Sequence, residues 1–325
     1  MLRKMYVVLM AAVAMFGQRP GGLADRIWRA QLPEEQRQAL SAAYSEKAFA
    51  RMEAILKGSV LAEVPPASAA ELQALLGALE FVGGRMNQAV QAFQRSESLK
   101  PLDDHDRFTL AMAQVNLGDV NGSRVELTRL NENHPDQPIY LYWLARLDYG
   151  QRLYDEAVEK LNKVIRLDPN SVRGYDNLGL SFDMMGFPDE AQGAFAKAVD
   201  LNRKLAAPSP WPPQNLGYLM LRMEKFHEAE EYLREALKYD PRFALAHYHL
   251  GRVLEHEAKD DAAIVEYRSA AALDDKIAEP LYSLGRLYLR HGRAVEAESV
   301  LAEYTRRRAL AVDAPYEAPA IETRK

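Results

Sequence analysis

The chain has 325 residues with a formal net charge of −5, 27% charged residues, 48% hydrophobic residues and no cysteine. The lack of cysteine excludes disulfides, thiol chemistry and a lipoprotein anchor, and the mild acidity argues against nucleic acid as the main ligand.

The N-terminus has the parts of a secretory signal peptide. Arg3 and Lys4 precede an uncharged apolar run over residues 5–16, and small residues at 22–24 precede Asp25. The run is too short to span a bilayer. The pattern predicts a signal peptide over residues 1–24 and export to a periplasmic or extracellular location. The alternative is a cytoplasmic protein in which this segment is a buried helix against the first repeat.

Residues 25–69 are helical in character and precede the regular part of the sequence. Leu40, Tyr44, Ala48, Met52 and Leu56 recur at helical spacing. We interpret this segment as a helical N-terminal cap, because terminal units of an array need an atypical outer face. A degenerate hairpin starting near Glu35 is the alternative.

From residue 70 the chain repeats itself with a period of 34 residues, apart from one interval of 38. The first series is Leu76, Leu110, Leu144, Leu178, Leu216, Leu250 and Leu284. A small residue follows each leucine: Gly77, Ala111, Ala145, Gly179, Gly217, Gly251 and Gly285. A second small series, at position 20 of each unit, is Ala89, Ser123, Ala157, Ala191, Ala229, Ala263 and Ala297. Large residues stand four positions later, at position 24: Phe93, Leu127, Leu161, Phe195, Leu233, Tyr267 and Leu301.

Each unit is predicted to be a pair of antiparallel helices. Large residues at positions 4, 7 and 11 form the buried stripe of the first helix, helix A. The small residues at positions 8 and 20 allow close approach of the second helix, helix B. Prolines 101, 135, 169 and 241 close four units. In the other three Arg203, Asp275 and Ala309 stand at that position, and helix B is expected to run on there.

These residues resemble the tetratricopeptide repeat family in length and in the key positions. The units are 70–103, 104–137, 138–171 and 172–205 (units 1–4, residues 70–205), then 210–243, 244–277 and 278–311 (units 5–7, residues 210–311). The resemblance implies an all-α fold, an α-solenoid of stacked helix-turn-helix repeats in a right-handed superhelix. It also implies a non-catalytic protein that binds other proteins.

The longer interval contains an insertion at residues 206–209 within a proline-rich linker, and Trp211 lies in that linker. Proline-dense segments usually act as stiff connectors, which favours a rigid spacer. The alternative interpretation is that a loop holds Trp211 out as a possible contact residue. Residues 312–325 carry two prolines and no helical stripe, so they are predicted to be a flexible tail.

Opposite the buried stripe, positions 2, 5, 9, 12 and 13 of helix A form a second stripe, which lines the concave groove of tetratricopeptide proteins. The candidate groove residues here are Phe108, Tyr142, Arg146, Tyr149, Tyr218, Arg222, Tyr248, Arg252, Tyr282, Arg286 and Arg290. Tyrosine and arginine are the types enriched at binding hot spots, and an arginine can hold a carboxylate with two hydrogen bonds. We therefore expect a protein or peptide partner with an acidic segment. For the tyrosines, packing against the adjacent helix is an equal alternative, and Glu255 could neutralise Arg252.

Asn177 and Asn215 share position 6, where asparagines of some family members bond the backbone of a peptide ligand. The lysine and asparagine clamp of chaperone-binding relatives is not reproduced.

The sequence offers no catalytic or cofactor motif. It contains no nucleophile motif, phosphate-binding glycine loop or dinucleotide fingerprint. His247 and His249 are two residues apart on a helix, so they point to different faces and predict no metal site. We expect no enzyme activity, no cofactor, no nucleic acid and no integral membrane span, and the sequence does not indicate an oligomeric state. The leading hypothesis is a non-catalytic scaffold or adaptor. The alternative is an assembly or structural factor for a bacterial-type envelope complex, such as pilus or outer-membrane machinery.

Overall fold

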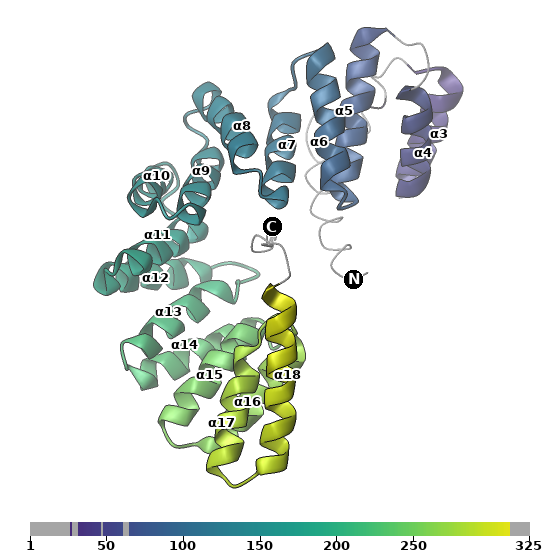
Figure 1. Cartoon of the computed structure of the whole chain (residues 1–325). Coiled ribbons are helices and arrows are strands. Elements are labelled where there is room, and N and C mark those ends of the chain that lie inside the picture. Colours follow the sequence, from purple (N-terminus) through teal and green to yellow (C-terminus); the bar gives the residue numbers. More distant parts are fainter. Residues whose placement is uncertain (1–26, 28–31, 47, 61–64, 313–325) are drawn as a thin grey trace. The chain divides into compact units, whose positions relative to one another are not determined.

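The computed structural model describes residues 27, 32–46, 48–60 and 65–312, which form sixteen α-helices, α3 to α18, and no strand (Figure 1). The all-α prediction is confirmed. The predicted signal peptide lies outside the described residues, as does the tail beyond Val312, and both remain predictions.

Successive helices pair into hairpins joined by short turns. The described part of the chain divides into two compact parts, one ending at Pro135 and one beginning at Asp136. The first part contains α3 (Glu34–Ser45), α4 (Phe49–Val60), α5 (Pro66–Val82), α6 (Met86–Leu99), α7 (Asp104–Leu117) and α8 (Val120–Asn133). The second part contains α9 (Pro138–Gly150), α10 (Tyr154–Leu167), α11 (Val172–Met185), α12 (Pro188–Asn202), α13 (Trp211–Arg222), α14 (Phe226–Tyr239), α15 (Ala244–His256), α16 (Asp260–Leu273), α17 (Glu279–Arg290) and α18 (Ala294–Val312).

Close contact between the two helices of a unit depends on the small residue at position 8. A Cβ atom on Gly251 would lie 2.6 Å from Cδ1 of Tyr267, and one on Gly285 would lie 2.5 Å from Cγ of Leu301. Both distances are below van der Waals contact, so the large residue at position 24 occupies the space that glycine leaves. The sequence prediction for these two positions is confirmed.

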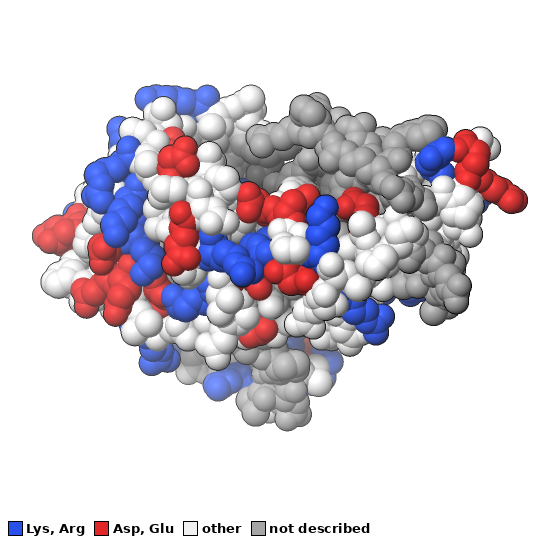
Figure 2. All heavy atoms as spheres, turned by 90° about the horizontal axis from the view of Figure 1, so that it is seen from above, with Lys and Arg blue, Asp and Glu red and all other residues white. Residues whose placement is uncertain are grey.

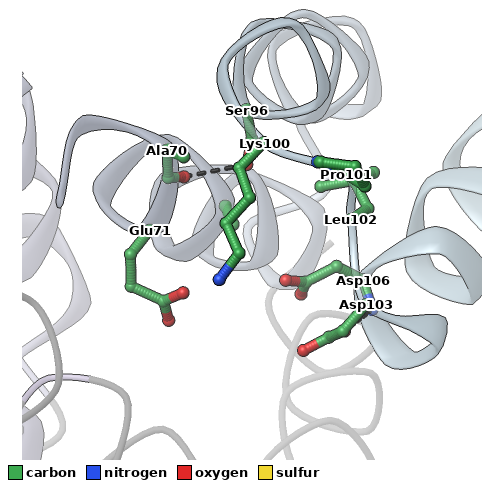
Figure 3. A pocket seen from close by; sticks show the side chains of 9 residues that line it. Ala70, Glu71, Ser96, Lys100, Pro101, Leu102, Asp103 and Asp106 are labelled. Carbon is green, nitrogen blue, oxygen red and sulfur yellow. Dashed lines mark hydrogen bonds between the residues drawn. The ribbon is translucent and has the colours of Figure 1, made fainter. Parts of the chain in front are cut away.

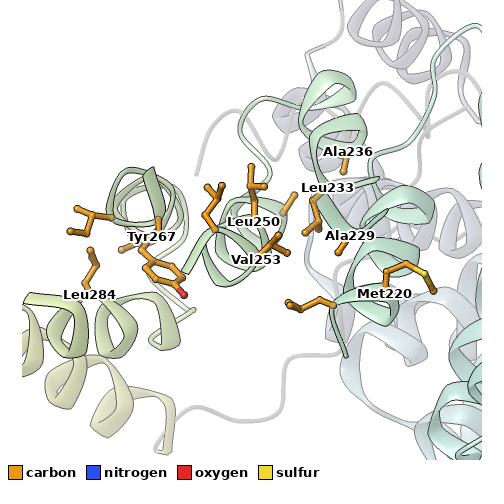
Figure 4. Packing of buried hydrophobic residues seen from close by; sticks show 14 of the residues in the cluster. Met220, Ala229, Leu233, Ala236, Leu250, Val253, Tyr267 and Leu284 are labelled. Carbon is orange, nitrogen blue, oxygen red and sulfur yellow. The ribbon is translucent and has the colours of Figure 1, made fainter. Parts of the chain in front are cut away.

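The leucine series forms the core of both parts. All seven leucines are buried, and Leu250 has no exposed surface. Figure 4 shows how the core runs from one hairpin to the next in the second part, where Leu233, Leu250, Tyr267 and Leu284 come from four successive helices. Each hairpin therefore buries its apolar surface against its neighbours.

The hairpin α3–α4 precedes unit 1 and packs on α5. Leu40 and Met52 are buried in the core of the first part. Glu80 of α5 is almost fully buried and forms ion pairs with Arg85 and with Lys57 of α4, the latter at 3.3 Å. This segment thus has the two helices that a degenerate repeat would have.

The end of helix B does not depend on the closing proline. In unit 6, where Asp275 replaces proline, α16 still ends at Leu273 because Oδ1 of Asp274 accepts a hydrogen bond from the Lys276 N–H at 2.9 Å. The same turn occurs at Asp240 and Asp168, before prolines. The expectation that helix B runs on is wrong at Asp275 and at Arg203, where α12 ends at Asn202. It is correct at Ala309, because α18 continues to Val312.

The connector between α12 and α13 is fixed by the buried side chain of Asn202. Its Nδ2 donates to the carbonyl of Ser209 at 2.8 Å, and its Oδ1 accepts from the Ser209 N–H at 2.9 Å. Arg203 donates two hydrogen bonds to Glu235, at 2.9 and 2.6 Å. Trp211 is the first residue of α13 and is half-buried, with its ring edge-on to Phe243 at 4.8 Å between centroids. This corrects the interpretation of Trp211 as a residue held out by a loop.

Candidate protein-binding surface

In the second part, helices A of successive units are linked by polar side chains at positions 5 and 6. Nδ2 of Asn177 lies 3.4 Å from the hydroxyl of Tyr142, one unit earlier. Nδ2 of Asn215 donates to both carboxylate oxygens of Asp176, at 3.0 and 3.1 Å. Both asparagines, expected to bond a peptide backbone, thus contact the preceding unit instead. Asn215 is also buried, so we leave it out of the binding surface.

Asp176 is a buried carboxylate between α11 and α13. It accepts two hydrogen bonds from the neutral amide of Asn215, and no cation among the described residues lies within ion-pair distance of it. Burial raises the pKa of the Asp176 carboxyl to about 7 because the charged form loses its hydration, and the bond from Asn215 opposes this only in part.

His249 forms the next link, between α13 and α15. Nε2 of Gln214 lies 3.2 Å from its Nδ1, and the ring stacks on Tyr218 at 4.3 Å between centroids. Burial and the nearby Arg252 lower the pKa of His249 to about 3, so the ring is neutral at physiological pH. His247 points elsewhere and contacts Glu266 at 2.6 Å. The two histidines therefore lie on different faces, as the sequence predicts.

Three of the candidate groove arginines are already paired with carboxylates of the preceding unit. Arg222 lies 2.6 Å from Asp183, Arg286 lies 2.6 Å from Glu255, and Arg290 lies 2.5 Å from Asp260. Glu255 also accepts the hydroxyl of Tyr267 at 2.9 Å. The expectation that Glu255 neutralises Arg252 is wrong, because Oε1 of Glu255 pairs with Arg286 of the next unit and Oε2 accepts from Tyr267.

Arg146 and Arg252 differ from these three. Arg146 lies over the ring of Trp143 at 4.9 Å, and Arg252 lies over the ring of Tyr248 at 6.0 Å. Both are half-buried, and neither has a carboxylate oxygen within 4.0 Å among the residues that the structure describes.

The structure brings Tyr218, Tyr248, His249 and Arg252 together on neighbouring helices A of units 5 and 6. Tyr248 lies 5.3 Å from the ring of His249, which in turn stacks on Tyr218. We call Tyr218, Tyr248 and Arg252 the Tyr–Arg cluster. His249 is buried against the two tyrosines and, like Asn215, is left out of the binding surface. Its contact with them was not predicted, although its position 6 is the one that singled out the two asparagines.

Of the other candidate residues, Arg222 lies over the ring of Tyr218 at 5.8 Å, and the following ones have contacts of their own. Tyr149 contacts Tyr154 at 5.5 Å, and Tyr282, which is 52% exposed, contacts Tyr304 at 5.4 Å. Tyr142 is buried against Trp143 at 5.7 Å. Phe108 is half-buried in α7 of the first part.

A small cleft of about 120 Å³ lies between α5, α6 and α7 in the first part. Figure 3 shows the amine of Lys100 and the carboxylates of Glu71, Asp103 and Asp106 around it. The lining carries one lysine and three carboxylates, and the hydrogen bond from Ser96 to the carbonyl of Ala70, 2.8 Å long, closes one wall. We assign no ligand to this cleft.

Charges of both signs are interspersed on the face drawn in Figure 2. Within the described ranges, no cluster of three or more histidines and acidic residues is arranged to hold a metal ion. No helix in that portion of the chain is both long and apolar enough to cross a membrane.

Helical hairpins that repeat every 34 residues and stack in series define an α-solenoid of the helical-repeat class. The tetratricopeptide repeat model matches residues 108–172 and 215–277. Together with the repeat over residues 70–311, this match shows that the chain belongs to the tetratricopeptide repeat family.

The chain is similar to several known proteins. It is 27% identical over 125 residues to the uncharacterized protein ycf37 of Cyanophora paradoxa, covering 38% of this chain and 73% of that protein. It is 26% identical over 241 residues to the human protein O-mannosyl-transferase TMTC3, covering 68% of this chain but only 26% of the human protein. A tetratricopeptide repeat protein from Parabacteroides merdae matches with a TM-score of 0.65 and 16% identity, covering 79% of this chain and 98% of that one. PilW, a type IV pilus biogenesis factor, matches with a TM-score of 0.56 and 19% identity, covering 62% and 92%. These structural likenesses show the fold alone.

Proposed function

We propose that the chain is a non-catalytic scaffold that binds a partner protein through an acidic peptide segment at the Tyr–Arg cluster. The observation that carries this proposal is that Arg252 has no carboxylate partner among the described residues. It is half-buried over Tyr248 and lacks a carboxylate within the described chain, whereas Arg222, Arg286 and Arg290 on the same row of helices each have one.

The surroundings of Arg252 favour a bound carboxylate. His249, its neighbour, is neutral at physiological pH and adds no second charge. Partial burial strengthens a charge-assisted hydrogen bond to the guanidinium, which can accept a carboxylate with two parallel bonds. The half-exposed rings of Tyr218 and Tyr248 beside it offer apolar contact area for the residues that flank the acidic one. The cluster thus fits a segment in which an acidic residue lies next to apolar residues.

The relatives supply neither a partner nor an activity for this chain. TMTC3 is named a transferase, but the chain covers 26% of it, so that activity is not carried over. The likeness to PilW at 19% identity shows the fold alone, and a role in envelope assembly stays a hypothesis, as does export.

A peptide array probed with the full chain tests the proposal. We expect peptides with an acidic residue beside apolar residues to bind, and Arg252→Ala to weaken them about tenfold to a hundredfold, since hydrogen bonds to charged groups are worth about 1.5–3 kcal/mol. Arg146→Ala is tested in parallel, because Arg146 offers the same kind of contact three units away.

Arg234→Ala is the matched control. It removes the same charge from α14, where Arg234 pairs with Glu230 at 2.7 Å on its own helix. Circular dichroism confirms that each variant is folded. Equal affinity of wild type and Arg252→Ala for every bound peptide would remove the Tyr–Arg cluster from consideration.

A further inference from the structure

The segment that follows α18 has the kind of sequence that fits the Tyr–Arg cluster. Within residues 313–322, Asp313, Glu317 and Glu322 are carboxylates, none is a cation, and the others are alanine, proline, isoleucine and one tyrosine. This stretch lies outside the described residues. Its sequence places acidic residues beside apolar ones, which is the pattern expected of a segment that binds the cluster.

Glu317 is the carboxylate best suited to Arg252. It directly follows Tyr316, whose ring can pack on the tyrosines of the cluster, and the three residues on either side of it carry no charge. Glu322 is followed by two cations, at 324 and 325, which oppose its approach to a guanidinium. Asp313 adjoins the end of α18 and has the least freedom to move away from it.

The prolines of the segment favour binding in an extended form. Pro315 and Pro319 flank Glu317 on both sides. Proline fixes its own φ and disfavours helical geometry in the residue before it. A segment restricted in this way loses less conformational entropy when it binds as an extended stretch.

The described end of α18, the last helix labelled in Figure 1, lies near the Tyr–Arg cluster. Arg308, one turn before Val312, interacts electrostatically with Glu279 of α17. Glu279 also acts on the hydroxyl of Tyr248, and Arg252 lies over the Tyr248 ring at 6.0 Å. The segment after α18 therefore starts close to the unpaired arginine.

We infer that residues 313–322 bind the Tyr–Arg cluster of the same chain, with Glu317 as the carboxylate partner of Arg252. This inference rests on the proposed function, because the segment occupies the site proposed for a partner protein. Residues 313–317 span up to about 17 Å when extended, and their attachment to α18 gives Glu317 a high effective concentration at the cluster. A partner peptide must displace the segment, so its dissociation constant is divided by the fraction of chains in which the cluster is free.

A zero-length cross-link in the full chain tests the contact. Arg252→Lys keeps the positive charge and supplies an amine, which carbodiimide joins to a carboxylate within ion-pair distance. We expect mass spectrometry to identify a link between position 252 and Glu317, and Glu317→Gln to remove it. Arg234→Lys is the matched control, which should link to Glu230, its partner at 2.7 Å, and not to Glu317. A control that links to Glu230 while position 252 does not link to Glu317 would overturn the inference.

Isotope mixing distinguishes the same chain from a second copy. Chains labelled with heavy nitrogen are mixed with unlabelled chains before the cross-linking reaction. We expect each linked pair of fragments to carry one isotope only. Pairs of mixed isotope would overturn the inference in favour of the segment of a second copy.

Peptide binding separates this inference from the proposed function. The probes are the acidic array peptides that Arg252→Ala weakens, and Glu317→Gln should lower their dissociation constants about tenfold, as for a segment bound in about nine chains of ten. Glu322→Gln is the control and should leave them unchanged; a gain from Glu322→Gln instead would overturn the assignment of Glu317. If Arg252→Ala weakens the peptides but Glu317→Gln changes nothing, the inference is wrong and the proposed function stands. If no peptide depends on Arg252, the proposed function fails, and the cross-link alone decides whether the segment occupies the cluster.

Discussion

Asp176 and His249 are predicted to give the stability of the array two opposing dependences on pH. The pKa of the Asp176 carboxyl is raised from 3.8 to about 7 in the folded protein. Between about pH 4 and pH 7 the folded state binds a proton that the unfolded state has lost, so the free energy of unfolding falls as pH rises. A shift of about three units corresponds to at most about 4 kcal/mol.

His249 acts in the reverse direction. Its pKa is lowered from 6.5 to about 3 in the folded protein, so the unfolded state binds more protons below pH 6.5. The stabilising effect of neutral His249 is present above pH 6.5 and is lost as pH falls towards 3, by at most about 5 kcal/mol. From about pH 4 to pH 6.5 the two pH dependences of the free energy of unfolding offset each other. From pH 6.5 to pH 7 only the dependence due to Asp176 remains.

Single variants separate the two effects. Asp176→Asn keeps a side chain that can accept from Asn215 but has no charge, so its stability relative to wild type should increase as pH rises from 4.5 to 8. His249→Gln should show the reverse trend, losing stability relative to wild type as pH rises from 4.5 to 6.5. The measurement is the urea midpoint of the full chain, followed by circular dichroism at pH 4.5, 6 and 8. A difference between Asp176→Asn and wild type that does not vary with pH would refute the reasoning.

Two further predictions concern the packing of the array. Gly251→Ala places a Cβ atom 2.6 Å from the buried ring of Tyr267 and should lower the free energy of unfolding by about 1–3 kcal/mol. Gly193→Ala, in helix α12, has no atom within 4 Å of the new Cβ and should raise it by up to about 1 kcal/mol. Urea unfolding measures both, and equal effects would contradict the close-packing argument. Asn202→Ala removes both hydrogen bonds that hold Ser209, so we expect the free energy of unfolding to fall by about 1–3 kcal/mol and hydrogen exchange to become faster in the connector between α12 and α13. Unchanged exchange there would show that the Arg203–Glu235 pair holds the connector alone.

The repeat positions that fill the core could be predicted from the sequence because their chemistry recurs. Leu250 and Gly251 recur in kind every 34 residues, and periodicity alone places both on the buried side of helix A. The end of α16 could not be predicted from the prolines, because the turn there depends on the Asp274 side chain, which accepts a hydrogen bond from the Lys276 N–H two residues later.

Whether a groove arginine is paired with a carboxylate could not be predicted from the sequence of a single unit. The partner of Arg286, Glu255, is 31 residues away, and the partner of Arg222, Asp183, is 39 residues away. Arg252 and Arg286 occupy the same position of helix A, so their sequence context looks equivalent. Only the stacking of successive units shows that Arg286 has a carboxylate partner and Arg252 has none. Comparing position 12 of each unit with position 13 of the next would have indicated the Asp183–Arg222 pair from the sequence.

The polar links between helices A also explain how a repeating array keeps its units in order. The apolar positions of different units are similar enough that one hairpin could stack on several others. Positions 5 and 6 hold a different pair at each of the three junctions from unit 3 to unit 6: tyrosine with asparagine, aspartate with asparagine, and glutamine with histidine. A wrong pairing would leave a buried carboxylate or amide without its partner, at a cost of about 1–3 kcal/mol for each such group. The buried polar residues on the inner side of the array therefore act against misaligned stacking, which the interchangeable leucines and glycines do not prevent.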